Sequence, residues 1–205
     1  MSGRRGNVLR VNVVERVSYA RYVDLAAASA RRLEYVAGVV RAMAGGTLEH
    51  ARLSVSVSTA LSVALRGRPC VVLSADARVR IRAADRATYP DVSVVCGRLE
   101  TDADDELSVV NPKIIVEVTS DTTESDDRTE KFADYRRLPS LAEYVLVSQR
   151  ARRIEVYRRD GRRWTLEEYG PGQSARLESV GVELSVDAIY FDPLGEPDAG
   201  APPTA

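Results

Sequence analysis

Hydrophobic positions recur along the chain with two different periods, and each period predicts one kind of element. Helical spacing from Ser18 to Ala30 and from Leu48 to Leu65 predicts two helices. A further helix is expected from Asp126 to Leu138, because Pro139 cannot continue it. Shorter runs rich in valine and isoleucine predict strands. These runs are Leu33–Val36, Val39–Met43, Cys70–Ser74, Ala77–Arg82, Val92–Cys96, Lys113–Val118, Glu143–Val147, Ile154–Arg158 and Trp164–Tyr169.

The pattern fades at both ends of the chain, which predicts flexible tails around a single domain. Residues 192–205 hold four of the nine prolines and no residue that could anchor a core. Residues 1–12 are expected to be similarly flexible. The remaining residues, 13–191, are of a size that one hydrophobic core can organise.

Charge and composition exclude several classes of protein. The 205 residues carry a formal net charge of −1, so the chain is not a general basic coat for nucleic acid, and any such contact is local. The single histidine, His50, excludes a histidine-rich metal cage and a catalytic histidine pair. Only Lys113 and Lys131 among the 29 basic residues are lysines. Arginine is therefore the default cation of this chain.

The cysteines and the hydropathy of the chain predict its cellular location. Cys70 and Cys96 both lie beside valines, which favours two buried, unpaired thiols over a redox pair or a zinc site. A reducing cytoplasm is therefore the expected location. No apolar run is long enough to span a membrane, and the residues after Met1 lack the apolar stretch of a signal peptide, so no membrane contact is expected.

Two charged segments are expected to face solvent. Arg78, Arg80 and Arg82 alternate with apolar residues, which predicts the outer face of a half-buried sheet rather than a track for phosphates. The acid-rich segment from Gly97 to Asn111 is expected to be a solvated loop.

Glu117 is the first candidate for chemistry, because its apolar neighbours predict a strand buried on both faces. A buried carboxylate needs an arginine partner, a strand end open to water, or a cation. Asp91 follows Pro90 at the start of another strand, and two acids on neighbouring strands are a candidate site for Mg²⁺. The stretch from Glu117 to Glu130 is strongly acidic, which favours a metal over direct binding of phosphate; the alternative is a solvated loop with a helix cap.

Lys131 lies in the predicted helix that follows this acidic stretch. One interpretation is a surface ion pair with Asp127, four residues earlier, which contributes only a few tenths of a kcal/mol. The other is a compact ammonium within the site, a task that the broader guanidinium of arginine performs less well.

The order and spacing of these motifs resemble a known family. The residues that carry the likeness are Pro90-Asp91, Val116-Glu117-Val118, Asp127-Arg128, Lys131 and Tyr135. Together they resemble the Uma-type restriction-endonuclease family of the PD-(D/E)XK nuclease superfamily, over about residues 18–190. The resemblance implies an α+β, restriction-endonuclease-like fold: a mixed central β-sheet flanked by helices, with an N-terminal helix and β-hairpin and extra C-terminal strands.

The resemblance also implies which residues act. Asp91 and Glu117 would be catalytic acids that bind Mg²⁺, for which Mn²⁺ is a possible substitute. Thr119 stands where the superfamily pattern expects a lysine. In Uma-type proteins this lysine is displaced to the following helix, which makes Lys131 the third catalytic candidate. Glu34 matches an acid that the superfamily contributes from an N-terminal element, although it could equally decorate a hairpin.

Three further residues are candidates for supporting the site, and each has a structural alternative. His50 could orient a ligand or simply begin the second helix. Asp76 could assist the acids or form an ion pair with an arginine. Tyr135 could hydrogen-bond into the site, or its ring could pack with Phe132 in the core.

The leading hypothesis is a Mg²⁺-dependent endonuclease that hydrolyses phosphodiester bonds in nucleic acid, DNA before RNA. A homodimer is expected, because enzymes that cut both strands often pair two sites across a twofold axis. One alternative is an inactive nuclease-fold module that binds nucleic acid or protein, which the absence of a basic surplus favours. Another is a metal-dependent hydrolase of smaller phosphate esters. The pattern identifies no residues that contact nucleic acid.

Overall fold

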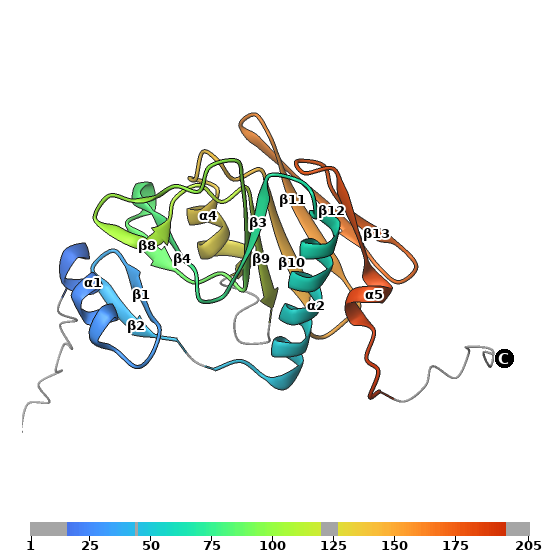
Figure 1. Ribbon diagram of the computed structural model, residues 1–205, viewed down its shortest axis with the longest axis horizontal. Coiled ribbons are helices and arrows are strands. Elements are labelled where there is room, and N and C mark those ends of the chain that lie inside the picture. Colours follow the sequence, from blue (N-terminus) through green and yellow to red (C-terminus); the bar gives the residue numbers. More distant parts are fainter. Residues whose placement is uncertain (1–15, 44, 120–126, 196–205) are drawn as a thin grey trace, which may run out of the picture.

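The alternating segments assemble into stacked sheets and helices in the computed structural model (Figure 1). It describes residues 16–43, 45–119 and 127–195. Within these residues the strands form two six-stranded sheets and one two-stranded sheet. The predicted tail at residues 1–12 and most of the tail at 192–205 lie outside the described residues. The mixed α+β class expected from the sequence is confirmed.

The first sheet has the strand order β2-β1-β5-β4-β8-β7. Its strands are β1 (Leu33–Val36), β2 (Val39–Ala42), β4 (Arg78–Ile81), β5 (Arg86–Thr88), β7 (Thr101–Asp102) and β8 (Asp105–Val109), with a 3₁₀ turn, η1 (Arg82–Ala84), after β4. The predicted hairpin is present: Ala37 and Gly38, both with positive φ, make the two-residue turn between β1 and β2.

The second sheet has the strand order β12-β11-β10-β9-β6-β3. Its strands are β3 (Cys70–Ser74), β6 (Val92–Cys96), β9 (Ile114–Thr119), β10 (Glu143–Ser148), β11 (Ile154–Asp160) and β12 (Arg163–Tyr169). Strands β9 and β10 run parallel and the other neighbours are antiparallel. A parallel pair needs a crossover connection, and this one carries much of the candidate site.

One face of the second sheet is covered by α2 (Leu48–Ala64), the long helix at the right of Figure 1. Thr47 caps this helix by accepting a hydrogen bond from the His50 amide, as a polar N-cap should. Leu53, Val57 and Leu61 repeat at helical spacing and pack against the valine-rich face of the sheet. The other helices are α1 (Tyr19–Ala28) and α5 (Val186–Tyr190); the small sheet pairs β13 (Ser174–Leu177) with β14 (Val182–Ser185).

The opposite face of the second sheet packs against the first sheet and the β9–β10 crossover. Ile115 and Leu146 point to this side and form a core with Val79 of β4 and with Leu138. Because successive side chains of a strand alternate, Glu117 lies on the same face as Ile115, away from α2. The fold therefore directs this acid into the space beneath the crossover.

The crossover differs from the single helix predicted for residues 126–138. It contains a π-helical turn, η2 (Asp127–Lys131), followed by the one-turn helix α4 (Phe132–Tyr135). Residue 126 lies outside the described residues. Phe132 stacks on Tyr144 and also contacts Tyr157, which anchors the crossover to the sheet. The wider π-helical turn, a feature often found at functional sites, places Asp127 and Lys131 on the side facing Glu117.

One prediction about the charged segments is wrong, and the other is right only in part. Arg78 and Arg80 are only 5 % and 7 % exposed, because α1 covers their face of the first sheet. The Arg80 guanidinium lies 3.8 Å from the centre of the Tyr19 ring, a favourable cation–π contact. Residues 97–111 form β7 and β8 rather than a loop, and the carboxylate of Asp105 on β8 lies 3.3 Å from Arg78. Asp105 therefore neutralises a buried arginine, whereas Glu100, Asp104 and Glu106 of the same segment face solvent. Only Arg82 is well exposed, as the sequence pattern indicated.

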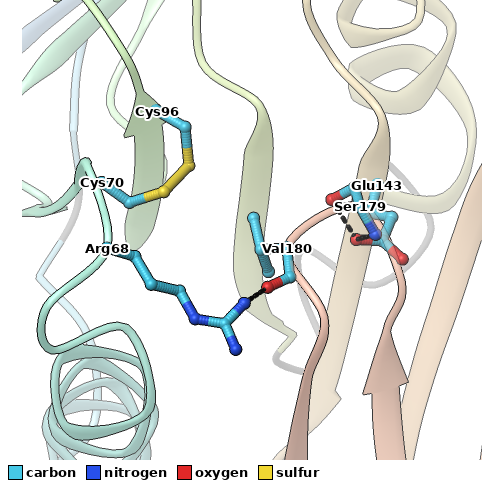
Figure 2. The surroundings of a disulfide bond; sticks show 6 residues. All are labelled: Arg68, Cys70, Cys96, Glu143, Ser179 and Val180. Atoms are coloured by element: carbon cyan, nitrogen blue, oxygen red, sulfur yellow. Dashed lines mark hydrogen bonds between the residues drawn. A yellow bond between two sulfur atoms is a disulfide. The ribbon is translucent and has the colours of Figure 1, made fainter.

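The prediction of unpaired cysteines is also wrong. Cys70 and Cys96 are directly opposite each other on the antiparallel strands β3 and β6, with Cα atoms 4.0 Å apart, and form a disulfide (Figure 2). The periodicity predicted both strands but not their pairing. Since unpaired thiols were the basis for expecting a reducing compartment, that expectation loses its support.

Neighbouring contacts in Figure 2 join the C-terminal hairpin to the rest of the fold. Arg68 donates to the carbonyl of Val180, and Ser179 donates to the buried carboxylate of Glu143 on β10. Across the described part of the chain, no helix is both long and apolar enough to cross a membrane.

Replacing both Cys70 and Cys96 by serine should lower the free energy of unfolding by about 2–4 kcal/mol, because the disulfide restricts the unfolded chain. Urea denaturation followed by circular dichroism measures the difference. A reducing agent should destabilise the wild-type protein by a similar amount and leave the double variant unchanged. Equal stability of the wild-type protein with and without reductant would contradict the disulfide.

Candidate active site

Glu117 is the central acid of the candidate site. It is only 3 % exposed and lies beside Leu146 on the parallel neighbour β10. The Tyr135 hydroxyl donates a 2.7 Å hydrogen bond to Glu117 Oε1. Burial is the main cause that raises the pKa of Glu117; the charge of Lys131 opposes it, and the nearby carboxylates of Asp91 and Asp127 raise the pKa further. A cation near this acid would therefore stabilise its charged form.

Asp91 lies next to Glu117 at the start of β6. Strand β6 is antiparallel to β9 with Val92 opposite Val116, so Asp91 falls beside the end of β9. Its Oδ2 accepts a 2.7 Å hydrogen bond from the Val118 amide, which joins the two acidic strands directly. The antiparallel register thus brings together two acids that are far apart in the sequence.

His50 contributes to the site from the first turn of α2. Its Nε2 lies 3.1 Å from Asp91 Oδ2. This hydrogen bond is the largest cause that raises the pKa of His50, so the contact favours the protonated imidazole. Of the two interpretations offered by the sequence, the contact with Asp91 makes His50 a partner of the acids as well as a residue at a helix start.

Lys131 makes contacts that a surface ion pair would not. Its Nζ lies 3.3 Å from Glu117 Oε1 and 2.8 Å from Asp127 Oδ1, and its side chain is only 14 % exposed. Burial by itself would lower the pKa of Lys131, but the charges of Glu117 and Asp127 outweigh it and raise the pKa. The ammonium therefore stays charged between two carboxylates.

Tyr135 combines both roles considered from the sequence. Its ring is fully buried in the core, against Tyr144 rather than Phe132. Its hydroxyl nevertheless reaches Glu117, and because burial raises the pKa of Tyr135, the hydroxyl keeps its proton and acts as the donor. Tyr135 thus fixes one oxygen of Glu117 in place.

The two remaining candidates, Glu34 and Asp76, lie in different positions relative to the acidic cluster. Glu34 on β1 accepts a hydrogen bond from Thr88 on β5, and its charge acts on Lys131, so it borders the cluster. Asp76 is 86 % exposed, lies 3.6 Å from Arg32, and makes no contact with the cluster within the described residues. Of the two readings of Asp76, the structure therefore shows the ion pair.

Asp127 is a residue that the sequence did not mark as a member of the site. Its side chain is almost fully buried, contacts Lys131, and its carbonyl accepts a hydrogen bond from Tyr144. Two signals were available: its position four residues before Lys131, which allowed a surface ion pair, and the membership of Asp127-Arg128 in the motifs that resemble the family. The resemblance placed Lys131 in the site but assigned no role there to Asp127.

Comparison with known proteins identifies the family of the chain. The family model Uma2, described as "Putative restriction endonuclease", matches residues 19–188. The chain belongs to the Uma2 family. Two proteins of Synechocystis sp. are similar to it: slr1290 is 35 % identical over 158 residues, covering 77 % of this chain and 82 % of the relative. The second, sll1609, is 31 % identical over 160 residues, covering 78 % and 90 %.

A solved structure shares the fold of this Uma2 protein. It is a crystal structure from Anabaena variabilis, titled as a putative nuclease belonging to DUF820, with a TM-score of 0.64 and 16 % identity. The match covers 79 % of this chain and 91 % of that chain. Family membership and fold together support a nuclease-like hydrolase.

The Uma2 family implies a divalent metal, and the acids present are suited to one. Asp91 Oδ1 and Glu117 Oε2 make no hydrogen bond within the described residues, whereas the other oxygen of each acid is held in place. Mg²⁺ commonly takes one or two carboxylates and completes its shell with water and phosphate oxygens. No group of three or more His, Cys, Asp or Glu side chains is arranged to hold a metal in residues 16–43, 45–119 and 127–195. The donor set therefore fits a loosely held Mg²⁺ rather than a protein cage.

Replacing Tyr135 by phenylalanine should destabilise the protein by about 1.5–3 kcal/mol, because a buried carboxylate loses its donor. Urea denaturation measures the change. Tyr157→Phe is the matched control: its ring packs in the same core, but its hydroxyl makes no hydrogen bond within the described part of the chain. Equal stability of the two variants would contradict a role of the Tyr135 hydroxyl in holding Glu117.

Proposed function

We propose that this Uma2 protein is a Mg²⁺-dependent endonuclease that hydrolyses phosphodiester bonds of nucleic acid, DNA before RNA. One observation supports this function above the others: the Asp91 carboxylate before β6, the Glu117 carboxylate on β9 and the Lys131 ammonium on η2 lie close together over two interior strands of the second sheet. Two carboxylates can bind a metal ion, and a nearby ammonium can contact a phosphate that binds to the same metal.

Asp91 and Glu117 are the proposed metal ligands, each through the oxygen that lacks a protein donor. Bound Mg²⁺, or Mn²⁺ in its place, would polarise the scissile phosphate and lower the pKa of an attacking water. The protein supplies the positioning. The Val118 amide and His50 orient Asp91, and Tyr135 orients Glu117.

Lys131 is proposed to stabilise negative charge that develops on the phosphate or to orient the attacking water. Its ammonium is held by Glu117 and Asp127, so it keeps its charge in a largely buried position. Glu34, at the border of the cluster, adds negative charge and completes the proposed catalytic set.

The near-neutral charge of the chain bears on the substrate. A polyanion is repelled by a cluster of carboxylates unless a metal reverses the local field, so the proposed substrate binds together with the metal. We include a homodimer in the proposal, since two copies present two sites to the two strands of a duplex. Sedimentation velocity measures whether two copies associate.

Asp91→Ala and Glu117→Ala should each lower the rate of Mg²⁺-dependent plasmid cleavage at least about a hundredfold, because the metal supplies several kcal/mol of transition-state stabilisation. Asp76→Ala is the matched control, since it removes an exposed acid outside the cluster, and it should cleave at the wild-type rate. Gel electrophoresis of supercoiled, nicked and linear DNA measures the rates.

Cleavage that persists unchanged in Asp91→Ala and Glu117→Ala would rule out this site. The alternative of an inactive binding module has a different signature. Calorimetry would then detect no uptake of Mg²⁺ or Mn²⁺ at millimolar concentrations, and DNA would remain intact with the wild-type protein. Hydrolysis of a small phosphate diester without cleavage of plasmid would instead favour the smaller substrate.

Lys131→Arg keeps the positive charge but replaces a compact ammonium with a planar guanidinium. The variant should lose activity about tenfold or more, because the guanidinium cannot occupy the same space between Glu117 and Asp127. Lys113→Arg, which changes the only other lysine, should retain activity. Full activity of Lys131→Arg would mean that Lys131 is only an ion-pair partner.

A further inference from the structure

A second concave site lies apart from the acidic cluster. A cavity of about 560 Å³ opens where the end of β4, strand β7 and the segment after α4 meet. Ile81, Val110, Leu138 and Pro139 give it largely apolar walls. The volume is within the range of sites that bind small organic molecules. None of the residues of the acidic cluster lines it, so the proposed hydrolysis does not account for this cavity.

The charged residues around the cavity are mostly basic. Arg80, Arg82 and Arg137 line it, against one acid, Asp102. Arg82 is bound to Asp102 through two hydrogen bonds, of 2.6 and 2.9 Å, which also lower the pKa of Asp102 against the opposing effect of its burial. This pair largely neutralises itself.

Of the other two arginines, Arg137 keeps capacity to bind. It donates one hydrogen bond, from Nη1 to the Ala83 carbonyl at 2.9 Å, and makes no ion pair within the described residues. Arg80 is largely buried: its Nη2 binds Asp85 and its guanidinium lies against the Tyr19 ring, so its charge is already engaged. The lining thus combines an apolar interior with positive charge that no carboxylate of the cavity offsets.

We propose that this cavity binds a small aromatic anion, with its ring between the apolar walls and its anionic group on Arg137. A guanidinium suits both parts of such a ligand, because it pairs with carboxylate, sulfonate or phosphate groups and also stacks on aromatic rings. An uncharged apolar ligand would leave the charge of Arg137 without a partner. An aliphatic polyanion would gain little from the apolar part of the lining.

The occupant would touch the segment that also supports the acidic cluster. Arg137 and Leu138 follow α4 directly, and Tyr135, the last residue of α4, holds Glu117. The two sites are nevertheless separate in their residues. Binding at the cavity can therefore be measured without metal or nucleic acid, and its outcome is independent of the proposed nuclease activity.

Anilinonaphthalene sulfonate is a suitable probe, since it is a small aromatic anion whose fluorescence rises in apolar surroundings. Titrated into the full chain, it should bind one saturable site, and about tenfold more tightly than phenylnaphthylamine, which lacks the sulfonate. Arg137→Gln should remove this difference by weakening only the anion. Arg136→Gln is the matched control, because Arg136 is an exposed neighbour outside the cavity lining, and it should bind both probes like the wild type.

A second variant tests the cavity without changing charge. Ala103 also lines the cavity and is exposed, so Ala103→Trp should fill the cavity without disturbing the core, and both probes should lose binding at least about tenfold. Circular dichroism checks that each variant is folded. Wild-type affinity in Ala103→Trp, equal affinity of the wild type for both probes, or the absence of saturable binding would each overturn the proposal.

Discussion

Lys131 lies between the carboxylates of Glu117 and Asp127, at 3.3 and 2.8 Å, in a region from which water is largely excluded. Removing one member of a buried ion pair typically costs about 3–5 kcal/mol, because the remaining charge loses its partner. The order of the strands explains how the chain brings these three groups together. Strands β9 and β10 are parallel, so the chain must cross over between them, and the crossover brings Lys131 and Tyr135 to the face on which Glu117 lies.

The same contact bears on the lysine that the family resemblance implies is displaced from position 119 to Lys131. Thr119, two residues after Glu117, lies on the same face of β9, because side chains of a strand alternate. A lysine there would reach the acids from the strand itself. In this chain the ammonium beside Glu117 belongs instead to Lys131 of η2, which packs on that face of the sheet. A lysine ammonium thus contacts Glu117 from the crossover rather than from β9.

Buried charge is a recurring feature of this fold, and it explains why the net charge says little about the surface. Arg78 pairs with Asp105, and Arg80 pairs with Asp85 beneath the tyrosines of α1. The sequence pattern placed these two arginines on a solvated face, but in the first sheet each is neutralised by an aspartate. The exceptions are informative: within the described residues, Asp91 Oδ1 and Glu117 Oε2 make no hydrogen bond and Arg137 makes no ion pair, and these groups lie at the two proposed binding sites.

The sequence by itself determined most of the elements, because hydrophobic period, caps and turn residues act over a few neighbouring positions. It indicated α1, α2, the hairpin of β1 and β2, and the strands that carry Asp91 and Glu117; the order of short motifs indicated the family and Lys131. Only the tertiary structure decided what pairs with what. The Cys70–Cys96 disulfide, the burial of Arg78, the strands β7 and β8, and the inward turn of Asp127 all depend on contacts between residues distant in sequence or on a local π-helical turn. A residue's burial is set by the elements that cover it, and a periodic pattern shows which face is apolar but not which neighbour will cover the polar one.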